Sequence, residues 1–155
     1  MFQQAVVLVK PDGLQRGLVG EIVTRFEKKG LKLAGMKMMR LTDEILDEWY
    51  VHHKGKPFFG NLKSFMMSSP IVAMLWEGVE CVDSVRILTG ITKAREADAG
   101  SIRGDLAMSQ QLNLIHASDS DENAKKERDL IFAPEEVFHY DKDLEVHIYA
   151  VDERK

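Results

Sequence analysis

Hydrophobic residues fall into short continuous runs, separated by stretches in which they recur at helical spacing. Residues 5–9 (AVVLV) form the first run, and residues 71–76 (IVAMLW) form another. Short runs rich in β-branched residues are typical of strands buried on both faces. Residues 31–41 alternate in part between apolar and polar side chains, and residues 112–117 (LNLIHA) form a further short run. The pattern therefore predicts four strands.

Helices are predicted between these strands. Apolar side chains recur every three or four positions in residues 18–29, and Gly30 provides a natural stop. Thr42 is suited to cap a helix that extends to about residue 53. Further helices are predicted over residues 59–67, 82–89 and 120–131.

Two segments do not follow either pattern. Residues 10–13 (KPDG) are predicted to close the first strand as a turn. Residues 90–111 combine three glycines with scattered charges and little periodicity, so they are predicted to form a loop. Loops of this length inside a compact domain are uncommon and are usually functional.

The order of elements predicts the fold class. Without the added helices the order is β-α-β-β-α-β, which is typical of an α+β fold, an α/β sandwich of the ferredoxin-like type. Helices would then pack on a four-stranded antiparallel sheet. A helical hairpin (residues 42–67), the long loop and a C-terminal extension are additions to this plan. We expect residues 1–155 to form a single domain.

Composition excludes several classes of function. The net charge of −4 argues against general nucleic-acid binding, which usually shows a basic excess. Cys81 is the only cysteine, so no internal disulfide forms, and we expect an inert core thiol in a reducing, cytoplasmic compartment. No signal peptide is visible, and no apolar run approaches the about 20 residues of a membrane span. Trp49 and Trp76 are predicted to fill the core.

Residues 113–119 (NLIHASD) place a histidine where an apolar run gives way to small and polar residues. A histidine at the exit of a buried strand is anchored by the core and is open to a cleft. Its imidazole can accept a proton or a phosphoryl group near neutral pH. His116 is therefore the first candidate for a catalytic residue. The neighbouring pair His52 and His53 is predicted to be exposed.

A second candidate is a carboxylate on the inward face of the last helix. At about 100° per residue, Ala124, Leu130 and Ile131 define an apolar arc, and Glu127 falls in its middle. A carboxylate in such a place needs a partner. Two interpretations stay open: Glu127 reaches water at the edge of a cleft, or it orients His116 and fixes its tautomer.

Basic residues could supply a phosphate site beside the histidine. Lys10, Arg86 and Arg103, with the hydroxyl of Thr92, would suit a polyphosphate, although each alone is commonly just a solvated or turn residue. The P-loop, dinucleotide-binding and protein-kinase signatures are absent. A kinase that acts through a phosphohistidine requires none of them.

Several short motifs, taken together and in this order, complete the picture. They are residues 9–13 (VKPDG), residues 15–17 (QRG), Tyr50, residues 57–59 (PFF), residues 100–105 (GSIRGD) and residues 113–120 (NLIHASDS). On these motifs the chain resembles the nucleoside diphosphate kinase family over nearly its whole length. Any one of them alone would not be specific.

The resemblance implies a transferase that moves the γ-phosphoryl group of a nucleoside triphosphate to a nucleoside diphosphate and so maintains NTP and dNTP pools. It implies a ping-pong course through phosphorylated His116, with Mg²⁺ bound through the nucleotide phosphates and not by a protein metal site. It also implies a homo-oligomer, with the choice among hexamer, tetramer and dimer left open. Residues 93–94 are Lys-Ala where the family commonly has Asn-Pro in an interface loop, so oligomer stability is less predictable than activity.

The resemblance also implies a role for each catalytic side chain. Nδ1 of His116 would take the phosphoryl group, while the other ring nitrogen would meet Glu127. Ser118 would support that glutamate. Lys10 would contact the γ-phosphate and the ribose 3′-hydroxyl, and Tyr50 would help position the histidine.

The remaining implied contacts are with the nucleotide. Asn113 would bind the ribose, and Phe58 would stack on the base with Leu62 alongside. Because every base has a π face, stacking predicts broad nucleotide specificity. Three side chains would hold the phosphates: Arg86, Thr92 and Arg103.

Three other functions fit the sequence less well than a kinase. A nucleic-acid-binding module of the same fold would need a basic face and paired aromatic residues on its central strands, which are not seen. A catalytically inactive scaffold would be favoured by loss of His116, Lys10 or Arg103, and all three are present. A hydrolase built on His116, Ser118 and Asp119 would lack a nucleophile elbow.

Overall fold

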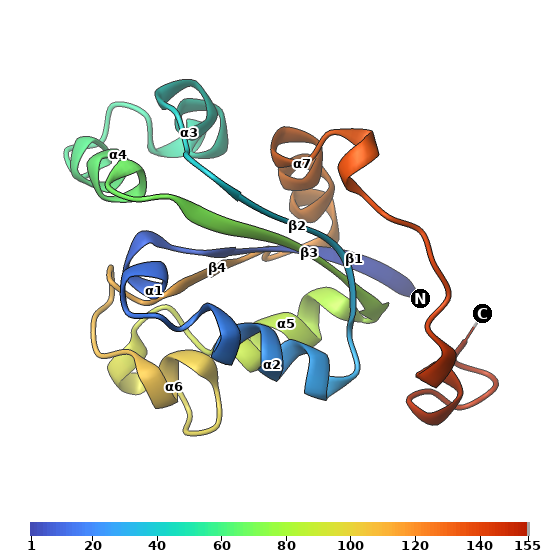
Figure 1. Cartoon of the computed structure of the whole chain (residues 1–155). Helices are drawn as coiled ribbons and strands as arrows, with labels where there is room; N and C mark the ends of the chain where they lie inside the picture. The colour runs from blue at the N-terminus through green and yellow to red at the C-terminus, as the bar shows by residue number, and fades with distance from the viewer. Residues whose placement is uncertain (155) are drawn as a thin grey trace.

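A computed structural model describes residues 1–154 and has at its centre a four-stranded sheet in the order β2-β3-β1-β4 (Figure 1). The strands are β1 (Phe2–Val9), β2 (Lys32–Met39), β3 (Ile71–Val79) and β4 (Ile115–Ala117). Each pair of neighbouring strands is antiparallel. The sheet therefore confirms the predicted ferredoxin-like α+β fold.

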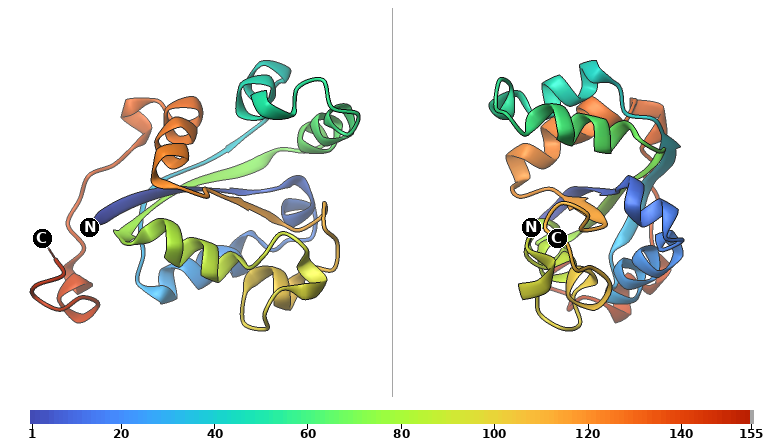
Figure 2. Two further views of the ribbon diagram at one scale, coloured as in Figure 1. Left: turned by 180° about the vertical axis from the view of Figure 1, so that it is seen from behind. Right: turned by 90° about the vertical axis from the view of Figure 1, so that its left-hand side faces the viewer.

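Helices cover both faces of the sheet. Their bounds are α2 (Val19–Lys29), α3 (Asp43–Trp49), α4 (Phe59–Met67), α5 (Cys81–Thr89) and α7 (Asp121–Ile131). Helices α3, α4 and α7 lie on one side of the sheet, whereas α2 and α5 lie on the other (Figures 1 and 2). This arrangement gives the molecule two separate apolar layers.

Strand β1 shows why both layers form. Val7 and Val9 belong to the core under α2 and α5, while Val6 and Leu8 belong to the core under α3, α4 and α7. Because successive side chains of a strand point to opposite faces, a continuous apolar run can serve two cores. The prediction of a strand buried on both faces is confirmed.

Helix ends follow the local signals in the sequence. Gly30 ends α2 with a φ of 105°, a conformation that favours glycine. The Thr42 hydroxyl accepts a hydrogen bond from the Ile45 amide at 3.3 Å, and Ser120 caps α7 in the same way through Asn123 at 3.1 Å. Only three residues separate the end of β4 from the start of α7, so this cap also sets the place of Glu127 relative to the strand.

Two predictions about the N-terminal half were wrong. The residues predicted to form a turn begin a short helix, α1 (Pro11–Gln15), with proline in the first helical position where its missing N–H costs nothing. The helix expected to reach residue 53 ends at Trp49. It is followed by a 3₁₀ turn, η1 (Val51–His53).

Two further differences concern the segment before His116. The predicted loop contains the 3₁₀ turn η2 (Ala94–Glu96) and the short helix α6 (Ile102–Leu106), which Ser101 caps. The fourth strand begins at Ile115 and not at residue 112. Leu114 has a φ of 73°, and this left-handed conformation cannot continue a strand.

The chain after α7 contains two 3₁₀ turns, η3 (Pro134–Glu136) and η4 (Asp143–His147). It runs along the outer side of β2, where the Phe138 amide donates to the Ala34 carbonyl at 2.7 Å. Figure 1 shows this segment, in orange and red, passing beside the sheet toward the end that holds the N-terminus. Among residues 1–154 no helix has the length and apolar character that crossing a membrane requires.

Candidate active site

A cleft of about 790 Å³ opens where β1 ends and β4 begins, between the helical hairpin and the segment that links α5 to β4. It gathers most of the residues that the sequence singled out. Those that line it are Lys10, Tyr50, Phe58, Leu62, Arg86, Thr92, Arg103, Asn113 and His116. Glu127 and Ser118 do not line this cleft, and they lie behind the histidine.

His116 is held by a carboxylate from α7. Its backbone pairs with Leu8 in the sheet, and its Nε2 lies 3.0 Å from Oε1 of Glu127. The Glu127 side chain is only 14% exposed. Of the two interpretations left open by the sequence, the geometry therefore selects the contact with the histidine.

Ser118 fixes the glutamate in turn. Its hydroxyl donates to Oε2 of Glu127 and accepts the Val6 amide of β1 at 2.9 Å. Ser118 is fully buried, so this link is shielded from water. A chain of hydrogen bonds thus runs from the sheet through Ser118 and Glu127 to the imidazole.

Two aromatic residues at the end of α3 line a cavity together with the histidine. Burial, and to a smaller extent the charge of Glu127, raises the pKa of Tyr50 to about 12, so its hydroxyl stays protonated. The Trp49 ring lies 4.9 Å from the His116 ring, at 79° to it. The sequence predicted Trp49 as a core residue and missed this contact, whereas Trp76 is fully buried as predicted.

Lys10 is a buried cation at the end of β1. Its Nζ donates to the Gln111 carbonyl at 2.8 Å and to Oδ1 of Asn113 at 2.9 Å. Burial lowers the pKa of Lys10 to about 8, an effect that Asp12 opposes and Arg103 reinforces. Lys10 is therefore charged at neutral pH and close to its titration.

Arg103 connects α6 to the strand that carries the histidine. Its guanidinium donates to the Ile115 carbonyl at 2.6 Å and to the Gly90 carbonyl at 2.9 Å. Burial, followed by the nearby charge of Arg86, lowers the pKa of Arg103 to about 10. Arg103 therefore keeps its charge at neutral pH while it holds both ends of the segment around the cleft.

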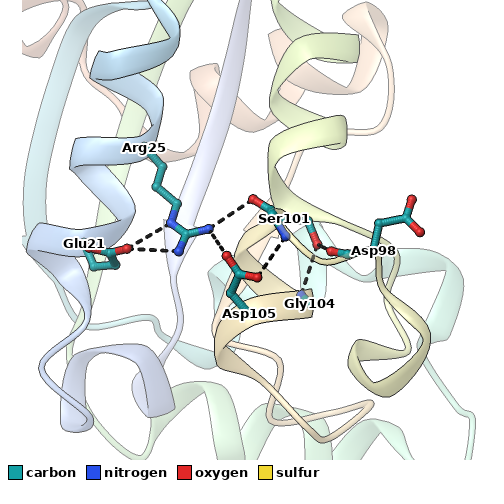
Figure 3. A network of polar contacts seen from close by, with 7 residues as sticks. Glu21, Arg25, Asp98, Ser101, Gly104 and Asp105 are labelled. Carbon is teal, nitrogen blue, oxygen red and sulfur yellow. Dashed lines mark hydrogen bonds and ion pairs between the residues drawn. The ribbon is translucent and has the colours of Figure 1, made fainter.

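A polar network anchors α6 to α2 (Figure 3), through residues that do not line the cleft. Arg25 of α2 donates to Oδ2 of Asp105 at 2.7 Å and to the Gly100 carbonyl at 3.1 Å. Asp105 also accepts the Gly100 amide at 2.8 Å, so the turn before α6 is closed by the same carboxylate. The sequence carries no signal for this contact, because 80 residues separate Arg25 from Asp105.

The end of the cleft beside the helical hairpin is aromatic. Phe58 is half exposed, and its ring lies 5.2 Å from that of His53, at 67°. His53 lines the cleft and is half-buried, so the prediction that it is exposed was wrong. Burial lowers the pKa of His53, and the charges of His52 and Lys56 lower it further.

Asn113 is buried, and its side chain links three segments of the chain that surround the cleft. Its Nδ2 donates to the carbonyls of Thr92 and Gln110 at 3.0 and 2.8 Å, while Oδ1 accepts from Lys10. These bonds tie the segment between α5 and β4 to Lys10, close to the start of the strand that carries His116. Arg86 and Thr92 are exposed at the opening and have room to meet a ligand.

Comparisons with known proteins are consistent along the chain. The sequence model of the family described as "Nucleoside diphosphate kinase" matches residues 3–137. A nucleoside diphosphate kinase of Parabacteroides distasonis is 52% identical over 152 residues, which cover 98% of this chain and 99% of that protein. One from Carboxydothermus hydrogenoformans is 47% identical, covering 96% and 99%.

Solved structures agree with the sequence comparisons. A halophilic nucleoside diphosphate kinase from Halobacterium salinarum, solved in complex with CDP, matches with a TM-score of 0.93 and 44% identity, covering 97% of this chain and all of that one. A nucleoside diphosphate kinase family protein from Babesia bovis matches with a TM-score of 0.92 and 42% identity, covering 95% and 99%.

Proposed function

The chain belongs to the nucleoside diphosphate kinase family, and we propose that His116 carries the phosphoryl group in the transfer between nucleotides that this enzyme performs. The observation that supports this role most strongly is the contact of Nε2 with Glu127. It leaves Nδ1 as the ring nitrogen without a hydrogen bond among residues 1–154, in a side chain that lines the cleft. A neutral imidazole that donates from Nε2 has its lone pair on Nδ1.

In the first half-reaction, the Nδ1 lone pair forms a bond to the γ-phosphorus of a nucleoside triphosphate. The bond from that phosphorus to the β–γ bridging oxygen breaks, and the nucleoside diphosphate leaves with the electron pair. In the second half-reaction, a terminal oxygen of another diphosphate takes the phosphoryl group and frees His116. Glu127 holds the proton on Nε2 throughout, so no proton is lost from the ring.

Positioning and charge provide most of the catalysis in phosphoryl transfer. We propose that Lys10, Arg86 and Arg103 stabilise the charge that develops on the phosphoryl oxygens, and that Thr92 donates to the phosphates. Lys10 and Arg103 are held in place by backbone and Asn113 oxygens. These cations are therefore oriented before a nucleotide arrives, which lowers the cost of reorganisation in the reaction.

Mg²⁺ would enter the cleft on the nucleotide phosphates, as expected from the sequence. It would neutralise phosphate charge there. The carboxylate of Asp119 lines the cleft and suits this arrangement, because Mg²⁺ prefers phosphates and one or two carboxylates to a full protein cage. Its hydrogen bond from Asn123 lowers the pKa of Asp119, so the group is ionised at neutral pH.

Base recognition would rest on Phe58, with Leu62 beside it and Asn113 near the ribose. Phe58 is half exposed and lines the cleft, as a stacking platform must be. The related enzyme from Halobacterium salinarum was solved with CDP, a pyrimidine nucleotide. Because stacking tolerates any base, we propose broad nucleotide specificity.

Two parts of the proposal concern the setting of the enzyme. We propose a homo-oligomer and a cytoplasmic location, the latter supported by a single cysteine, Cys81, that is buried and whose pKa burial raises to about 12. The nucleic-acid-binding and scaffold alternatives gain no support from the relatives named above, which carry the kinase name.

The deciding experiment is phosphorylation of the protein by ATP and Mg²⁺ with labelled γ-phosphate. We expect an acid-labile, alkali-stable phosphoprotein that any nucleoside diphosphate discharges, and we expect His116→Ala to abolish it. His139→Ala, which changes a histidine in the C-terminal segment, is the control and should label fully. Transfer by His116→Ala at a rate near that of the native protein would disprove the mechanism.

A further inference from the structure

The hydrogen bond to Glu127 does not by itself fix the plane of the His116 ring. The covalent bond to Cβ and the hydrogen bond at Nε2 hold two points of the imidazole, and the ring can still turn about the line that joins Cβ to Nε2. Nδ1 would then swing across the cleft. A nucleophile must be held close to its line of attack, since a misplacement of about 1 Å can cost about 100-fold in rate.

Trp49 lies in a position that restricts this rotation of the His116 ring. Its ring is nearly perpendicular to the imidazole, at 79°, with 4.9 Å between the ring centres. This edge-to-face arrangement is a preferred geometry for aromatic pairs and weakens when either ring rotates. The contact therefore restricts the one rotation that the bond to Glu127 allows.

Trp49 is itself well fixed. It is the last residue of α3, and it packs, half-buried, against the core layer that includes Leu46 of the same helix and Ile131 of α7. Helix α3 contacts α7, which carries Glu127. The same packing that seats the indole thus sets its distance from the carboxylate that holds Nε2.

Trp49 does not share the nucleotide cleft. It lines a second cavity of about 470 Å³ behind the histidine, together with Glu127, Asn123 and Leu130. The residues that line the nucleotide cleft include Tyr50 but not Trp49. A change at Trp49 should therefore alter the reactivity of His116 more than the binding of a nucleotide.

We propose that Trp49 is a positioning residue that holds the His116 ring in the orientation from which Nδ1 attacks. This inference rests on the proposed role of His116 as the nucleophile. The indole acts from behind, on the imidazole, and does not touch the substrate. Glu127 thus fixes Nε2 of the imidazole, and Trp49 fixes the plane of the imidazole ring.

The first test separates chemistry from binding. Trp49→Leu keeps an apolar side chain but removes the ring, and we expect single-turnover phosphorylation by ATP to slow by about tenfold or more. The dissociation constant for ADP should stay within about twofold, because Trp49 does not line that cleft. Trp49→Phe, which restores an aromatic edge, should recover most of the rate. A native rate in Trp49→Leu, or a loss of ADP binding that matches the loss of rate, would overturn the proposal.

The second test is spectroscopic and does not depend on the stability of the leucine variant. The chain has two tryptophans, and Trp76 is fully buried on the other face of the sheet, 5.2 Å from Phe26. We expect phosphorylation of His116 to change the intrinsic fluorescence of the native protein. Trp76→Phe should keep that change and Trp49→Phe should lose it. The reverse result, or no change in the native protein once it is fully phosphorylated, would refute the contact.

His116→Ala distinguishes the two proposals. If His116→Ala still forms the phosphoprotein, the nucleophile has been assigned wrongly and the role of Trp49 fails with it. If His116→Ala is inactive while Trp49→Leu reacts at the native rate, only the role of Trp49 fails.

Discussion

At the scale of single residues, Glu127 is expected to affect phosphoryl transfer only through its contact with His116. We expect Glu127→Ala to slow phosphorylation of His116 by about 10- to 100-fold, the usual cost of removing a carboxylate that orients a histidine. Binding of ADP should persist, because Glu127 does not line the nucleotide cleft. Single-turnover labelling measures the first quantity, and titration calorimetry with ADP measures the second.

A control for this change lies one turn and a half away on the same helix. Glu122 is 79% exposed and, among residues 1–154, forms its ion pair with Lys126. Glu122→Ala should therefore label at the native rate. Equal labelling rates in Glu127→Ala and Glu122→Ala would rule out an orienting role for Glu127.

Lys10 gives the site a dependence on alkaline pH. Burial lowers its pKa to about 8, so the side chain is charged below that pH and neutral above it. Since a neutral lysine cannot attract phosphate, kcat/KM, which reports groups of the free enzyme, should fall as the pH rises through about 8. Tyr50 and Arg103 do not titrate there, because their pKa values lie at about 12 and about 10.

The profile of kcat/KM between pH 6.5 and about 9.5 checks this expectation. Lys10→Arg keeps a charge over the whole range, so its kcat/KM should be lower than native at pH 7 but should not show the fall near pH 8. A native profile that stays level to the end of the range would contradict the assignment.

The sequence predicted which single residues could take part in chemistry better than it predicted which residues lie next to them in the structure. Glu127 could be recognised because a helical wheel exposes a carboxylate on an apolar arc, and the structure places it on His116. Trp49 carried no such signal, because an aromatic residue at the end of an amphipathic helix is ordinary. Its contact with His116 spans 67 positions and exists only once α3 and α7 have packed.

At the scale of elements, the long helices could be predicted from the sequence, whereas the short ones could not. The predicted helix over residues 59–67 has the bounds of α4, and that over residues 120–131 differs from α7 by one residue. Helices α1 and α6 have five residues each, which is too few to show a helical period. The late start of β4 depends on Leu114, whose left-handed backbone is held by Asp12 and the Lys10 amide, just after the end of β1.

The anchor between α2 and α6 provides a prediction at this scale. Arg25→Ala removes the bonds that close the turn before α6, so residues 100–106 should exchange amide hydrogens faster. Because Arg103 lies in α6, KM for the nucleotide should rise, but by about fivefold at most, since partly exposed pairs contribute little. Hydrogen exchange and steady-state kinetics measure the two effects.

A double-mutant comparison isolates the pair. Asp105→Asn should have a similar effect, and adding it to Arg25→Ala should cost less than the sum of the two changes, because both break one contact. Lys28 of α2 is exposed and takes no part in this network, so Lys28→Ala serves as the control. Additive effects of the two changes would show that Arg25 and Asp105 act separately.

At the scale of the whole molecule, β2 leaves the sheet with an open edge. The C-terminal segment covers its first part, where Phe138 bonds to Ala34. Within residues 1–154 no backbone hydrogen bond from that segment reaches residues 36–39. Met36 and Met38 are 45% and 63% exposed there. An apolar edge strand is a template for pairing with another chain, so we expect the proposed homo-oligomer to use this edge.

Light scattering tests that expectation directly. The native protein should have a mass that is a multiple of 17.6 kDa, and Met38→Lys should lower it, because charge on an edge strand opposes pairing. Ile87→Lys is the matched control. Ile87 is 75% exposed, but it lies on α5, which packs over β1 and not over the edge strand β2. A mass near 17.6 kDa for the native protein would exclude the oligomer. An unchanged oligomer in Met38→Lys would place its interface elsewhere. Since the cleft is built from one chain, Met38→Lys should still form the phosphohistidine even where the assembly is lost.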